Sequence, residues 1–378
     1  HVHAALPQLN RKMWAFGVSS SFTPAAAACA GAGGVLLGST VAFKTGVVGR
    51  VLGISSYTKS MLVKPCAHRL AMILGLILAG VLMAASISDS TPMHQPNSST
   101  RQRAVLLLRF GIGGILIGVG SFMQNGCTSG HGLTGLARLS FRSWFAVPTF
   151  MAAGVLAATL SGTATSLPPD GVTDKDWALA VTVVACVVAL LVCIAGASIL
   201  MRRINIACAT TAAPVVAELF VGASFGCGLA ISGMARPCKV AAFLDLGSGR
   251  WDPSLALVMG GGLLVTFPFF QALQRLDVEG PILGGTFDLP TNTSHVDLGF
   301  VLGAVVFGIG WGICGLCPGP VWVASGAAPS LEMATAVLGM LAGTAAMVFS
   351  DKGCEKVKPT QENESEASSE DAQIQPDP

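Results

Sequence analysis

Long apolar stretches recur along nearly the whole chain, and they decide what it can fold into. Nine can be counted, and most reach the roughly 17–25 residues that a membrane-spanning helix requires. In lipid, only structures that satisfy their own backbone hydrogen bonds are stable. We therefore predict an all-α polytopic membrane protein with about nine spans. The stretches lie at residues 25–43, 70–88, 104–122, 144–161, 177–201, 211–232, 254–273, 298–316 and 331–349.

Composition excludes a water-soluble globule. Of the 378 residues, 52% are hydrophobic and 11% are charged, whereas charged residues make up about 25% of an ordinary soluble domain. The mean hydropathy of +0.66 suits a chain whose solvent is lipid. A net charge of +2 creates no field that would recruit nucleic acid, so no nucleic-acid partner is expected. The expected surroundings are a lipid bilayer. We expect an integral, multi-pass protein of the plasma membrane or the bacterial inner membrane.

Glycines recur at fixed intervals, which indicates internal repeats. Pseudo-symmetric repeats are how many transporters are built, with the substrate site near the midplane where broken helices meet. Three shifts of the sequence bring matching glycines or cysteines together. A shift of 80 places residues 31–46 on 111–126, a shift of 82 places residues 226–233 on 308–315, and a shift of 190 places Cys127 on Cys317.

The repeats and the polar segments divide the chain into four parts. We expect an N-terminal segment at 1–23, a first membrane half at 24–205 and a second, repeat-related membrane half at 206–350. Residues 351–378 are rich in Glu, Ser and Gln, cannot bury a core and are expected to form a disordered acidic tail.

Three segments rich in Gly and Pro interrupt the apolar sequence: 124–135 (QNGCTSGHGLTG), 232–240 (SGMARPCKV) and 314–320 (CGLCPGP). Such backbone is tolerated at membrane depth only where it lines a cavity or is buried in protein. We therefore predict re-entrant turns between half-helices, so that each repeat is a helix–loop–helix unit. The exposed N–H groups and positive ends of half-helices can bind an anion without a buried cation.

The residues NGCTSGHGLTGLARLS at 125–140, with the glycine repeat at 33–53, resemble the sulfur-transport family of membrane proteins known as YeeE/YedE, whose members move thiosulfate. The second half, with SGMARPCKV and CGLCPGP, resembles the companion membrane proteins that bacteria often encode beside a YeeE-like partner. The chain therefore looks like a fusion of the two. The resemblance covers roughly residues 25–350.

The resemblance implies an hourglass-shaped importer with cysteines along a central path, which hand thiosulfate or a related sulfur anion inward through hydrogen bonds from their thiols. Cys127 lies in the family's GCTSGHG motif, and Cys317 lies in CGLCPGP. Cys238 is assigned to the path only because it lies in the third turn. A neutral thiol donates a weak hydrogen bond, which suits a soft anion that must also be released. A cytosolic sulfurtransferase-like acceptor is the expected protein partner.

Five further residues are candidates, each with a structural alternative. Asn125 and Gly126 lie beside Cys127 and are assigned to the path, although Asn125 also suits a turn. His131 either contacts the substrate or is a structural histidine. Lys239 either attracts anions to the path or extends toward the interface. Glu218 lies inside an apolar run, where it is a candidate proton site or a polar contact between helices.

Two other functions fit part of the pattern. Cys314 and Cys317 have the C-x-x-C spacing of a redox pair, which would make the chain a membrane-embedded thiol oxidoreductase or persulfide-handling enzyme. A metal site of Cys127, His131 and Cys317 is weaker, because no second histidine accompanies them. We favour a transporter, not an enzyme, with no cofactor and no metal.

Overall fold

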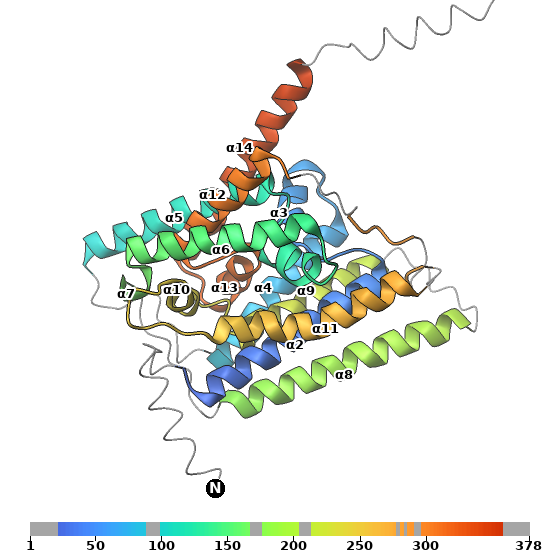
Figure 1. The fold of residues 1–378 in the computed structure, drawn as a ribbon. Coiled ribbons are helices and arrows are strands. Elements are labelled where there is room, and N and C mark those ends of the chain that lie inside the picture. Colours follow the sequence, from blue (N-terminus) through green and yellow to red (C-terminus); the bar gives the residue numbers. More distant parts are fainter. Residues whose placement is uncertain are drawn as a thin grey trace, which may run out of the picture.

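A computed structural model of the chain describes residues 22–87, 99–166, 176–203, 213–276, 280–282, 286–290 and 296–357. These residues form helices and their connections, without a β-strand among them (Figure 1). Nearly all of the predicted segment 1–23 lies outside the described residues, as does the tail from residue 358. Helix α14 continues to Val357, beyond the predicted boundary at residue 350.

Eight helices in the described part of the chain are long and apolar enough to cross a membrane, which confirms the predicted class. The remaining predicted stretch, 177–201, forms α8 (Asp176–Arg203). Within α8, the apolar part Val181–Ile194 is shorter than a span. The spans are built on α2 (Pro24–Val48), α4 (Ala67–Ile87), α5 (Thr100–Met123), α6 (Phe141–Ser161), α9 (Ala213–Ile231), α11 (Ser254–Arg275), α12 (Leu298–Cys314) and α14 (Leu331–Val357).

Each pair of long helices is joined by a short one, so that the fold contains four units of the form long–short–long. Three short helices lie at or just after the predicted breaks, whereas the first was not predicted. They are α3 (Ile54–Val63), the π-helix η1 (Thr128–Gly135), α10 (Pro237–Leu244) and α13 (Pro318–Ala327).

Capping residues fix where the long helices begin and end. The Thr23 hydroxyl accepts a hydrogen bond from the Ala26 N–H at 3.1 Å, and Pro24 follows as the first helical residue of α2. The Asp297 carboxylate caps α12 in the same way. Gly315 ends α12 with a φ of 70°, a left-handed conformation that glycine adopts without strain. These caps set the points where the chain turns into the interior.

The two halves pack through matching contacts. In the first unit α2 packs against α9 and α11, and in the second α5 packs against α12 and α14. A Cβ on Gly34 would run into the carbonyl of Val258, and a Cβ on Gly114 would run into the carbonyl of Ala336. The helix backbones approach closely at both places, because glycine has no side chain to keep them apart.

Helix α8 lies outside this arrangement and links the two halves. It runs along the edge of the bundle beside α2, as Figure 1 shows. Each half contributes two long–short–long units to a single helical bundle.

Candidate functional site

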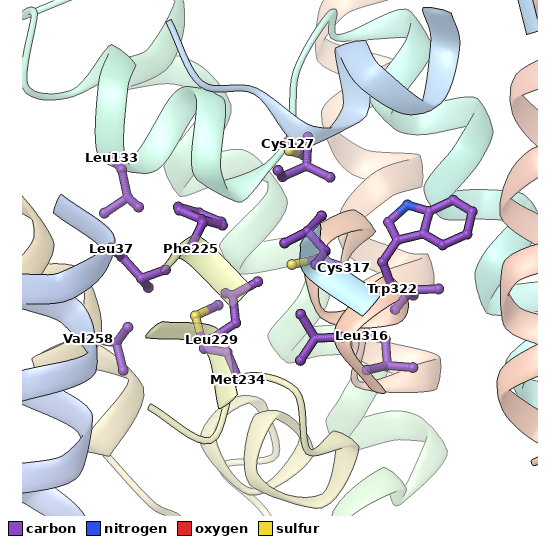
Figure 2. Close-up of a cluster of buried hydrophobic side chains, with 14 of the residues drawn as sticks. Leu37, Cys127, Leu133, Phe225, Leu229, Met234, Val258, Leu316, Cys317 and Trp322 are labelled. Carbon is purple, nitrogen blue, oxygen red and sulfur yellow. The ribbon is translucent and has the colours of Figure 1, made fainter. Parts of the chain in front are cut away.

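Two of the short helices, η1 and α13, line a small cavity. Figure 2 shows several of the side chains around it, among them Leu37, Phe225 and Cys317. The volume of the cavity is about 20 Å³, which is room for roughly one water molecule. One side carries hydroxyl and thiol groups and the other is apolar, and none of the lining residues is charged. The lining residues are Leu37, Thr128, Ser129, Leu133, Phe225, Leu229, Met234, Val258, Met259, Cys317, Gly319 and Pro320.

Cys127 is the residue immediately before η1, and its side chain is buried. Its Sγ lies 3.2 Å from the Ser129 Oγ, and its backbone carbonyl accepts a hydrogen bond from the His131 N–H at 2.9 Å. The thiol does not cap the helix, so the first N–H groups of η1 have no partner from this side chain. A thiol and the N–H groups of a helix start therefore lie together at this turn.

Cys317 occupies the same position before α13 in the second half. It is buried, and its Sγ lies 3.2 Å from the Thr128 Oγ1 of the facing turn. Pro318 is the first residue of α13, where its missing N–H costs no hydrogen bond. The contact between Thr128 and Cys317 joins the two halves of the chain directly at the cavity.

The other two units carry different residues at the corresponding place. Gly53 precedes α3 and Arg236 precedes α10, and neither side chain caps its helix. Cys238 lies one residue further inside α10 than the first helical residue, Pro237. Two of the four turns therefore present a thiol at the helix start.

Cys238 is not among the residues that line the cavity. Its buried side chain packs in a separate small cluster with Ala164 and Ala241. Lys239, also buried, lies 3.9 Å from the Asp252 carboxylate. Of the predicted thiols, only Cys317 lines the cavity, and Cys127 adjoins it through its contact with the lining residue Ser129. Cys238 and Lys239 lie in neither place.

His131 is held by the protein on both ring nitrogens. Its Nδ1 lies 3.0 Å from the Ser143 Oγ, and its Nε2 lies 3.1 Å from the Gln124 carbonyl oxygen. Because a carbonyl only accepts, Nε2 carries a proton and donates it to Gln124. A Cβ on Gly126 would run into this ring, so Gly126 is required where His131 packs. In the described chain no three His, Cys, Asp or Glu side chains gather as metal ligands.

Asn125 is exposed and has a φ of 54°. Asn tolerates this left-handed conformation better than most residues do. Its position suits the turn between α5 and η1 and is outside the lining of the cavity.

Glu218 of α9 is paired in a buried cluster. Its Oε2 accepts a hydrogen bond from the Lys44 Nζ of α2 at 2.9 Å, and the Tyr57 hydroxyl of α3 lies 3.0 Å from both carboxylate oxygens. The Lys44 Nζ also donates to the Tyr57 hydroxyl. The side chains of Lys44 and Glu218 are 0% and 3% exposed, so the pair is withdrawn from solvent.

Sequence reasoning missed four residues at these two places: Lys44, Tyr57, Thr128 and Ser129. Tyr57 is the single tyrosine of the chain, and Lys44 directly follows the apolar stretch 25–43. An ionisable side chain at the end of such a stretch is a signal of a functional site. Thr128 and Ser129 follow Cys127 directly, and their hydroxyls could have been assigned to the same turn.

A bundle of apolar spans whose interrupted helices meet at an internal cavity has the architecture of a multi-pass membrane transporter. Residues 5–157 match the family described as "Sulphur transport", and residues 213–358 match a "Family of unknown function (DUF6691)". The chain is 40% identical over 134 residues to a "Probable transporter" of Xylella fastidiosa (strain Temecula1), covering 35% of this chain and 86% of that protein. The chain belongs to the sulfur-transport family, YeeE/YedE.

Two further relatives agree with this assignment. A second "Probable transporter" of the same Xylella strain is 35% identical over 132 residues, which are 34% of this chain and 91% of that protein. The "Thiosulfate transporter TsuA" of Spirochaeta thermophila is 38% identical over 74 residues, 20% of this chain and 21% of its own length. These comparisons confirm the predictions of a transporter, rather than an enzyme, and of an integral, multi-pass membrane protein.

Proposed function

We propose that the chain imports thiosulfate, or a closely related small sulfur anion, through a path that passes Cys127 and Cys317. The observation that carries the proposal is the facing arrangement of the two helix starts, joined by the 3.2 Å contact between Thr128 and Cys317. The relative TsuA, named as a thiosulfate transporter, supports this choice of substrate. The path would therefore run between the two halves of the chain.

The chemistry of the cavity suits an anion that carries a terminal sulfur. The N–H groups at a helix start can bind negative charge without a cationic side chain. The thiols and the Thr128 hydroxyl add donors that can turn toward a passing ligand. Because the lining holds no cation, the anion is bound loosely enough to leave, as transport requires.

The described conformation is closed at this point. A cavity of about 20 Å³ is too small for thiosulfate, which contains five heavy atoms. Met234 and Met259 line it, and their unbranched side chains adopt alternative shapes more readily than branched ones do. We expect passage to require displacement of these side chains and of Leu229.

The division into halves forms part of the proposal. The N-terminal half supplies η1 and the C-terminal half supplies α13, which agrees with a fusion at about residue 205 of two membrane proteins. We propose a cytosolic sulfurtransferase-like protein as the acceptor of the delivered sulfur anion. A cysteine thiolate of such a protein would take the outer sulfur of thiosulfate as a persulfide, and sulfite would leave.

The test is uptake of labelled thiosulfate into vesicles that contain the purified protein. Cys127→Ala is expected to lower the uptake rate by about tenfold or more, since a donor at the path is lost. Cys29→Ala is the matched control, because Cys29 is a buried cysteine within α2, outside both the cavity lining and the turns that carry Cys127 and Cys317. Full uptake by a correctly inserted Cys127→Ala protein would contradict the proposal.

A further inference from the structure

A polar hollow opens above the buried pair of Lys44 and Glu218. Its volume is about 330 Å³, much larger than that of the central cavity. Tyr57 belongs to both places, because it lines the hollow and its hydroxyl contacts Glu218. The hollow is lined by Arg50, Val51, Ser56, Tyr57, Ser60, His68, Arg69, Asp288 and Pro290.

His68, at the start of α4, is another titratable group that lines the hollow. Its Nε2 is buried without a hydrogen-bond partner among the described residues. An imidazole changes its charge nearer to neutral pH than any other side chain, so it is suited to relay protons.

The groups that surround Glu218 come from three elements. Lys44 reaches it from α2 and Tyr57 from α3. Helix α4 packs against α9 and brings His68 and Arg69 to the hollow. Helix α13 also packs near α9 and carries no titratable residue. The part of α8 with described side chains offers only the exposed thiols of Cys186 and Cys193. One carboxylate is therefore balanced by one fully buried cation.

We propose that Glu218 is a proton-binding site that couples proton entry to anion uptake; this inference rests on the transport function proposed above. A proton from the hollow, relayed by the Tyr57 hydroxyl, adds to a carboxylate oxygen of Glu218. The carboxylate loses its negative charge and Lys44 keeps its positive charge. The proton leaves again when Glu218 re-forms its ion pair.

The reason for coupling is electrostatic. An uncompensated cation in the interior is costly, so protonation of Glu218 alone is unfavourable. Arg50 and Arg69 line the hollow, and the Arg50 Nε lies 3.9 Å from the Asp288 carboxylate. A small anion beside these arginines would balance the charge that Lys44 retains. Proton and anion consequently assist each other's binding, and by linkage each raises the affinity for the other. Because Tyr57 lines the hollow and its hydroxyl contacts Glu218, a proton passes between the two places over a short distance.

The first test compares two measurements on the same vesicles. Exchange of labelled for unlabelled thiosulfate without a pH gradient reports the path alone, and uptake driven by an acid exterior reports coupling. Wild-type protein is expected to take up thiosulfate about tenfold faster with a gradient of about one pH unit, which multiplies the proton ratio tenfold. Glu218→Gln, which resembles the protonated carboxyl, should lose this stimulation while still exchanging substrate.

Glu332→Gln is the matched control, because Glu332 is another buried glutamate, located in the first turn of α14. It should respond to the gradient as wild-type protein does. Retained stimulation in Glu218→Gln, or absent stimulation in wild-type protein that exchanges thiosulfate, overturns the coupling proposal alone. Absent exchange in wild-type protein overturns the transport proposal, and the coupling proposal with it.

A second measurement needs no variant and holds even if Glu218→Gln fails to fold. Thiosulfate is added to purified wild-type protein in weakly buffered detergent solution near neutral pH, and a pH indicator follows the protons. Binding of about one proton per bound anion is expected from the linkage. A saturating addition that binds without a pH change contradicts the proposal.

Discussion

The central cavity and the cluster of Lys44, Tyr57 and Glu218 differ in the charges that their side chains carry. The cavity is lined without a charged side chain and offers thiols, hydroxyls and helix starts. The cluster holds a cation and a carboxylate 2.9 Å apart, both almost fully buried. The cavity therefore offers a ligand neutral donors, whereas the cluster holds a buried pair of opposite charges.

The largest expected effect comes from breaking the ion pair. Lys44→Met leaves the Glu218 carboxylate buried without its cation, and loss of one partner of such a pair costs about 3–5 kcal/mol of the free energy of unfolding. The double variant Lys44→Met/Glu218→Leu should recover most of this loss. Thermal unfolding in detergent measures both. Equal losses in the single and double variants would show that the charges do not depend on each other.

Adding a charge to the neutral cavity should be nearly as harmful to transport. Ser129→Asp places a carboxylate beside Cys127 and in the lining, where it repels a dianion at short range in low dielectric. Uptake should fall by about a hundredfold, equivalent to ~2.7 kcal/mol. Ser129→Asn has the same shape without the charge and should lose much less. Similar losses in both variants would mean that size, not charge, limits the path.

A smaller effect is expected where the two halves touch. Thr128→Val keeps the shape of the side chain but removes the hydroxyl that lies 3.2 Å from the Cys317 Sγ. One hydrogen bond is worth about 0.5–1.5 kcal/mol, so uptake should fall by roughly two- to tenfold. Thr128→Ser retains the hydroxyl and should stay closer to wild type in the same uptake assay. The reverse order of the two variants would exclude a role for this contact.

Much of the fold could be predicted from the sequence, because its signals are local. Apolar stretches mark the spans, and the runs rich in Gly and Pro at 124–135, 232–240 and 314–320 mark three of the breaks. The short helix α3 was missed because residues 54–63 contain neither Gly nor Pro. There the break is signalled by Gly49 and Gly53, which enclose the three residues 50–52.

The candidate site was predicted less completely, because it depends on contacts between distant segments. The match of Cys127 with Cys317 across the repeats was visible, and both residues stand at the start of a short helix. The pairing of Lys44 with Glu218 joins residues 174 positions apart, which no local pattern reveals. Cys238 was placed at its turn by sequence alone, whereas its side chain packs with Ala164 and Ala241.

The thiol path is tested most directly by comparing two neighbouring cysteines. Cys317 lines the cavity, whereas the Cys314 Sγ contacts the Leu316 carbonyl at 3.7 Å and its Cβ faces Gly113 of α5. In the thiosulfate uptake assay, Cys317→Ala should lose about tenfold or more and Cys314→Ala should keep most of its rate. Equal loss in both variants, as a redox pair requires, or full uptake by Cys317→Ala, would contradict the account.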